Sequence, residues 1–138
     1  MIPSSDAVAA PLRTKATGLR RLGRALACTI TGLRHALAHE AAFRQEALAC
    51  GILIPLATLL PVARLERLTL VLSMLIVLLA ELFNSAIEAA IDRISLDHHP
   101  LSGRAKDLGS ASVGVALLMS ATCWLVIAGP VLLERLAA

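Results

Sequence analysis

The sequence predicts an all-α integral membrane protein, with one N-terminal amphipathic surface helix followed by three transmembrane helices. The 138 residues are 57% hydrophobic and only 17% charged, with a mean hydropathy of +0.77. Average soluble domains are roughly 45–50% apolar and about 25% charged, and a small one needs charge to cover its large relative surface. Long runs almost free of charge are the second observation, because a transmembrane helix needs about 20 apolar residues.

The N-terminal part divides into an extension, residues 1–18, and an amphipathic helix over about residues 19–38. No apolar core or cleavage site follows the basic residues at the start, so the stretch is not a secretory signal. Apolar residues then recur at spacings of three and four, which places them on one helical face. They are Leu19, Leu22, Leu26, Ile30, Leu33 and Leu37. A basic amphipathic helix beside a membrane span is expected to lie in the interface, attracted to anionic headgroups. The same helix could equally form one side of a lipid-substrate site.

Residues 19–138 form one membrane domain, with spans expected at about 41–63, 66–91 and 107–133. The third run is long enough to cross a bilayer without charge. The middle run is apolar except for a few polar residues, so it qualifies only if these lie near one end or inside a protein interface.

Lysine and arginine residues predict the orientation. Three spans place the N-terminus and the second connecting loop on one side, with ten basic residues against three on the other. Because basic residues gather on the cytoplasmic side, we expect the N-terminus and that loop to be cytoplasmic. We expect no nucleic-acid partner.

Three polar residues within the middle span, Glu81, Asn84 and Glu88, share one helical face, and Asp92 extends the row. A carboxylate near the centre of a span costs about 2.5 kcal/mol or more, and such residues are usually functional. The alternative is that they only hold helices together. Three helices per chain leave this row poorly shielded from lipid, so neighbouring chains are expected to cover it.

Further polar residues are predicted at the same depth, at the cytoplasmic entries to the first and third spans. They are Glu40, Arg44, Glu46, Lys106, Asp107 and Ser110. Carboxylates from two helices and a lysine suit a Mg²⁺-phosphate site, because Mg²⁺ shares oxygen ligands with phosphates and lysine offsets phosphate charge. No standard nucleotide-binding signature is present, so nucleotide chemistry would need a non-standard site. The four histidines are expected to be solvated, with no ligand pair among them.

Three motifs resemble the prokaryotic diacylglycerol kinase family: E-A-A-F-R-Q-E (40–46), E-L-F-N-S-A-I-E-A-A-I-D-R (81–93) and L-S-G-R-A-K-D-L-G-S-A (101–111). The resemblance extends from about residue 19 to the end of the third span. It implies a homotrimer in the bacterial inner membrane, with active sites between subunits at the cytoplasmic face. The implied reaction transfers the γ-phosphate of ATP to diacylglycerol, giving phosphatidate and ADP with Mg²⁺.

The resemblance also implies roles for individual residues. Glu81 is expected to be the general base, acting with Asn84, Lys106 and Asp107, while Glu40 and Glu88 hold the metal. The ATP-binding residues that it implies are Arg21, Cys28, Glu40, Glu88, Asp97, His98, His99, Lys106 and Asp107. The implied lipid-site residues are Arg34, Arg44, Glu46, Glu81 and Ser110.

Some positions depart from the better-known members of the family. Cys28 stands where they have tyrosine, Leu37 where they have tryptophan and His39 where they have asparagine, and Asp97-His98 replaces Glu-Tyr. A related branch phosphorylates undecaprenol, which is the alternative acceptor. A small proton-coupled transporter is a more distant alternative, but it needs acids reachable from both sides of the membrane.

Overall fold

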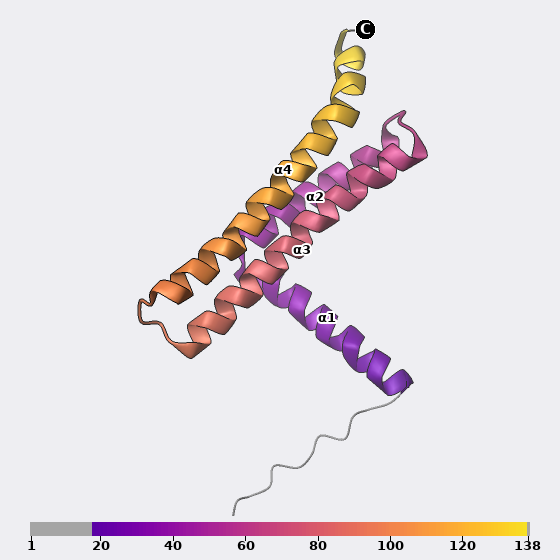
Figure 1. Cartoon of the computed structure of the whole chain (residues 1–138). Helices are drawn as coiled ribbons and strands as arrows, with labels where there is room; N and C mark the ends of the chain where they lie inside the picture. The colour runs from indigo at the N-terminus through magenta and orange to yellow at the C-terminus, as the bar shows by residue number, and fades with distance from the viewer. Residues whose placement is uncertain (1–17, 138) are drawn as a thin grey trace, which may run out of the picture. The chain divides into compact units, whose positions relative to one another are not determined.

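The computed structural model describes residues 18–137, and within them the chain is helical (Figure 1). The helices are α1 (Leu19–His39), α2 (Ala41–Leu59), α3 (Arg64–Ile94) and α4 (Pro100–Ala137). The all-α prediction is therefore confirmed. Apart from Gly18, the predicted extension lies outside the described residues.

Three of these helices are long and apolar enough to cross a membrane: α2, α3 and α4, with mean hydropathies of 1.2, 2.2 and 2.1. This confirms the three predicted transmembrane helices. At about 1.5 Å per residue, the 31-residue α3 is about 46 Å long. A hydrocarbon core is only about 30 Å thick, so α3 extends well beyond it.

Prolines explain where two of these helices begin or end. Leu60 is extended (φ −71°, ψ 140°) because Pro61 follows it, and α2 ends at Leu59. Pro100 occupies the first position of α4, where its missing N–H is no loss. α4 therefore starts seven residues before the expected span at 107, and the added turns carry polar residues.

The three apolar helices lie side by side, with α3 in contact with both α2 and α4 (Figure 1). At the end where α2 leads into α3, a buried cluster contains Ala57, Leu60, Leu70 and Ala128. There Arg67 of α3 donates hydrogen bonds to the carbonyl oxygens of Ala57 (3.2 Å) and Leu60 (3.1 Å). These carbonyls lie where α2 ends and lack partners in their own helix, so the arginine fastens α2 to α3.

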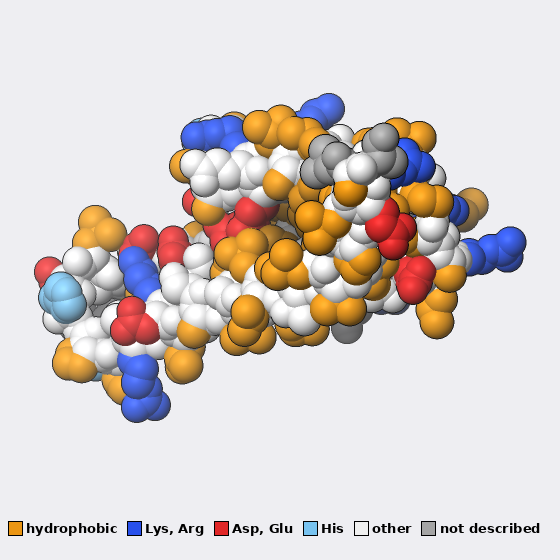
Figure 2. Space-filling view, turned by 90° about the horizontal axis from the view of Figure 1, so that it is seen from above, with side chains coloured by type: hydrophobic (Ala, Val, Ile, Leu, Met, Phe, Trp, Pro, Cys, Tyr) orange, Lys and Arg blue, Asp and Glu red, His pale blue; other side chains and the backbone are white. Residues whose placement is uncertain are grey.

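Large hydrophobic side chains are exposed along the spans, among them Leu72, Leu79, Val115 and Leu125. Hydrophobic side chains also cover much of the face seen in Figure 2. A surface of this kind is suited to lipid rather than water. Within α1 the apolar residues of the predicted face are likewise exposed, from Leu19 to Leu37.

The opposite end of the α2–α3–α4 bundle is polar. It is formed by the start of α2 at Ala41, the end of α3 at Ile94 and the start of α4 at Pro100. We call it the polar end. Glu40, with extended backbone (φ −97°, ψ 112°), separates α1 from α2 there.

Candidate active site

The row of polar residues on α3 descends toward the polar end. Glu81 is 5% exposed and Asn84 8% exposed, while Glu88 is half-buried. Counted from Arg64 at the other end of α3, Glu81 lies about 26 Å along the helix axis and Glu88 about 36 Å. Measured from Arg64 along α3, about 30 Å of hydrocarbon would end between Glu81 and Glu88.

Acidic side chains of two helices meet around Glu81. Its carboxylate interacts electrostatically with those of Glu88 and Glu40. Glu46, on the second turn of α2, interacts with Glu81 in the same way. One carboxylate oxygen of Glu46 is buried without a hydrogen-bond partner. A buried oxygen of this kind is costly unless a ligand or water satisfies it.

Asn84 lies at a close approach of α3 and α4. Its amide Nδ2 donates a hydrogen bond to Oε1 of Glu88 (3.1 Å), while its Oδ1 is buried without a partner. Gly109 of α4 faces it: a Cβ added there would collide with Oδ1 and lie 3.4 Å from Cγ of Asn84. A side chain at position 109 would therefore force the Asn84 amide to move.

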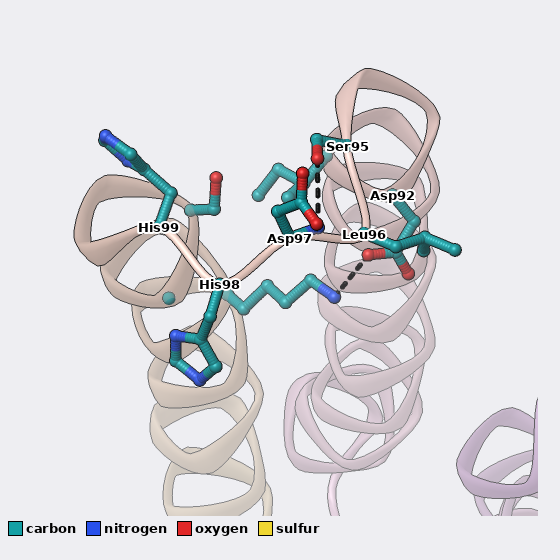
Figure 3. Close-up of a pocket in the computed structure, with 10 residues that line it drawn as sticks. Asp92, Ser95, Leu96, Asp97, His98 and His99 are labelled. Atoms are coloured by element: carbon teal, nitrogen blue, oxygen red, sulfur yellow. Dashed lines mark hydrogen bonds and ion pairs between the residues drawn. The ribbon is translucent and has the colours of Figure 1, made fainter.

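A pocket of about 120 Å³ opens between the end of α3 and the start of α4 (Figure 3). On its α3 side, Lys106 Nζ donates to Oδ1 of Asp92 at 2.5 Å, and both side chains are partly exposed. The connecting loop is ordered by Ser95, whose Oγ accepts a hydrogen bond from the N–H of Asp97 (2.9 Å). The imidazoles of His98 and His99 lie across the pocket from Asp92 in Figure 3.

The remaining predicted site residues are placed as follows. Asp107 and Ser110 are exposed on α4. Arg44 donates from Nη1 to the carbonyl oxygen of Ala38 (3.2 Å), which joins α2 to the last turn of α1. Arg34 is exposed just before that turn. Arg21 and Cys28 are exposed on the earlier part of α1.

The profile of the family described as prokaryotic diacylglycerol kinase matches residues 27–128. The chain belongs to this family. A diacylglycerol kinase of Pseudomonas aeruginosa is 48% identical over 108 residues, covering 78% of this chain and 88% of the relative. One from Escherichia coli K12 is 42% identical over 111 residues (80% and 91%), and one from Haemophilus influenzae 44% identical over 110 (80% and 93%).

Family membership confirms the resemblance seen in the three motifs and fixes the enzyme class as an ATP-dependent diacylglycerol kinase. It also removes the proton-coupled transporter as an alternative. Together with the three apolar helices, it makes the chain a multi-pass membrane protein of a prokaryotic family.

One line of reasoning toward the oligomer was wrong. The row on α3 was expected to be poorly shielded from lipid within one chain, yet Glu81 and Asn84 are already buried by their own helices. The prediction overlooked how closely α4 approaches α3 at Gly109, which closes one side of the row.

Two residues of the site had no predicted role, although Asp92 was already placed in the row on α3. Asp92, the partner of Lys106, follows Glu88 by four residues, so its place in the row was a usable signal. Gly109 carried no such signal, because only the packing of α3 on α4 reveals its role. The histidines are exposed as expected, but His35 and His39 form a pair, with ring centroids 4.5 Å apart, that was not expected.

The family implies Mg²⁺, and the acidic residues of the polar end fit it in part. Among residues 18–137, no three His, Cys, Asp or Glu side chains gather closely enough to hold a metal ion by themselves. Mg²⁺ typically takes only one or two protein carboxylates and completes its shell with water and phosphate oxygens. Glu40 and Glu88 can supply that pair.

Proposed function

We propose that this chain phosphorylates the free hydroxyl of diacylglycerol at the membrane boundary, with Glu81 as the general base. The observation that carries the proposal is the depth of the row on α3. Glu81 lies about where the hydroxyl of a two-chain lipid meets the headgroup region, and Glu88 lies about 10 Å further out, by the rise of an α-helix. The acceptor and the phosphate donor can thus meet along one helix.

The transfer proceeds in line. The lipid hydroxyl oxygen attacks the γ-phosphorus of ATP, its proton passes to the Glu81 carboxylate, and the bond to the β–γ bridging oxygen breaks to release ADP. Such a reaction needs positioning and charge neutralisation more than covalent participation by the protein. Asn84, hydrogen-bonded to Glu88, fixes the spacing between the base and the metal ligands.

Glu40 and Glu88 would hold Mg²⁺, which neutralises charge on the transferring phosphate when bound. Lys106 would break its ion pair with Asp92 and contact the phosphates instead. Asp107, the next residue in the sequence, is assigned to the same nucleotide site. The remaining nucleotide contacts are assigned to Arg21, Cys28, Asp97, His98 and His99. Those to lipid are assigned to Arg34, Arg44, Glu46 and Ser110.

We also propose a homotrimer in which neighbouring chains complete each site. The pocket of about 120 Å³ supports this, because ordinary ligand sites measure about 300–1,000 Å³ and ATP would need room beyond this pocket. Mass measurement and cross-linking in mild detergent test the assembly. An active monomer would contradict it.

The proposed location is the bacterial inner membrane, with the N-terminus and the polar end on the cytoplasmic side. The ten basic residues on that side against three on the other support this orientation, and ATP is available there.

The decisive experiment offers purified protein Mg-ATP with diacylglycerol and undecaprenol in parallel, in detergent and without any ion gradient. Phosphatidate formation at a much higher kcat/KM than undecaprenyl phosphate is the expected result. The relatives compared above are named diacylglycerol kinases, which favours this outcome. A preference for undecaprenol would overturn the acceptor while leaving the kinase chemistry in place.

A further inference from the structure

Two histidines on the last turn of α1 form a pair that the kinase mechanism does not use. His35 and His39 are four residues apart, so they share one face of the helix. Their ring centroids are 4.5 Å apart, and the ring planes are tilted by 44°. Both side chains are exposed, so their ring nitrogens are open to a ligand from the water phase.

The backbone beneath the pair is held in place. Ala36, between the two histidines, is buried, and its carbonyl oxygen accepts a hydrogen bond from the N–H of Glu40 (2.9 Å). Arg44 of α2 binds the carbonyl oxygen of Ala38. Because these contacts fix the turn, little backbone entropy is lost when a ligand bridges the two rings, and a preorganised pair binds more tightly.

We propose that His35 and His39 form a bidentate site for a borderline transition-metal ion, of the class Zn²⁺, Ni²⁺ or Cu²⁺. Imidazole suits these ions, and two histidines at i and i+4 on one helix face are a recurrent pair of zinc ligands. Tetrahedral zinc with two nitrogens at about 2.0–2.1 Å holds them about 3.3 Å apart. Rings whose centroids are 4.5 Å apart reach that spacing by small side-chain rotations.

Two protein ligands leave the remaining positions to water, so this is an open site of moderate affinity rather than a closed structural one. It differs in chemistry from the magnesium ligands proposed at Glu40 and Glu88. Mg²⁺ prefers oxygen and gives up water reluctantly, so it should not compete for two imidazoles.

The other histidine pair offers a matched control within the same chain. His98 and His99 are adjacent in sequence, and Nδ1 of His99 already accepts a hydrogen bond from the N–H of Leu101 (3.2 Å). Both residues lie in the loop before α4, and their imidazoles point in different directions in Figure 3, so this pair should not chelate.

The test is calorimetric titration of Ni²⁺, Zn²⁺ and Cu²⁺ into purified protein in detergent or nanodiscs. The protein carries no polyhistidine tag and contains Cys28→Ser, because Cys28 is an exposed thiol. We expect one site per chain, tightest for Cu²⁺ by the usual order of divalent metals and unaffected by millimolar Mg²⁺. His35→Ala and His39→Ala should each weaken binding about tenfold or more, because the second ligand then no longer acts at high effective concentration.

His98→Ala should leave the titration unchanged. A second readout is the imidazole NMR spectrum of the protein with all four histidines in place. On addition of Cu²⁺, the signals of His35 and His39 should broaden before those of His98 and His99. Equal affinity in His35→Ala and the parent protein would overturn the site, as would displacement of the metal by Mg²⁺. Either result would mean that the metal binds to groups other than His35 and His39.

Discussion

Replacing Glu81 by glutamine tests whether this carboxylate is a base or a structural contact. Glutamine keeps the size and can hydrogen-bond but cannot take a proton. A lost general base typically lowers the rate by about 10²–10⁴, which corresponds to about 2.7–5.5 kcal/mol of transition-state stabilisation. We therefore expect kcat to fall by that factor with both lipid and ATP saturating.

The same substitution should not destabilise the fold. The side chain is 5% exposed, lies just inside the hydrocarbon boundary and faces the carboxylates of Glu88 and Glu40. A neutral amide removes that repulsion and the cost of a charge at that depth, so the thermal midpoint should hold or rise. Affinity for ATP should be retained, because Glu40, Glu88 and Lys106 are unchanged.

Thermal stability, ATP affinity and lipid phosphorylation are measured on one preparation, with Glu134→Gln as the matched control. Glu134 is an exposed glutamate near the far end of α4, and its substitution should change none of the three. If Glu81→Gln is stable, binds ATP and still phosphorylates lipid near the parent rate, the base assignment is wrong. Lost stability with activity reduced only in proportion to folded protein would make Glu81 a structural contact.

Four other substitutions probe the rest of the site. Glu40→Gln and Glu88→Gln should lower kcat severely and shift the Mg²⁺ titration to higher concentration without unfolding the protein; unchanged titrations in both would remove them as ligands. Gly109→Ala should cost about 1–3 kcal/mol of stability, typical of an overpacked contact, and lower kcat by displacing Asn84; near-parent stability and rate would refute the close approach. Asp92→Asn releases its lysine partner, so KM for ATP should change more than KM for lipid, whereas equal changes would argue for a general structural effect.

The sequence was sufficient for the helices and for the candidate row, because both follow from local rules. A long run of residues without charge predicts a transmembrane helix, whatever that helix packs against. Spacings of three and four residues place Glu81, Asn84 and Glu88 on one helical face. Pro61 and Pro100 also mark helix bounds by their stereochemistry, but the spans predicted at 41–63 and 107–133 did not use that signal.

What the sequence could not reveal depends on which helices touch. The burial of Glu81 and Asn84 within one chain follows from α4 packing against α3 at Gly109, and a lone glycine has several other uses. The pairing of Lys106 with Asp92 depends on how the loop from Ser95 to His99 turns. His35 and His39 are different, because the prediction that the histidines form no ligand pair overlooked their spacing of four residues.

The length of α3 has a consequence for how an acceptor lipid is selected. Glu81 and Glu88 belong to one continuous helix, so the distance between them along the helix axis is fixed at about 10 Å, whichever lipid is bound. If Glu81 is the base and Glu88 a metal ligand, as proposed, the depth of the hydroxyl group should decide which lipid is phosphorylated, and the length of the tails should matter little. Lipids with long, short, saturated or branched chains should all be accepted, provided that the hydroxyl group lies at the depth of Glu81 in the bilayer. An alcohol anchored a few ångströms too deep would stay unphosphorylated, although it could diffuse freely past the enzyme.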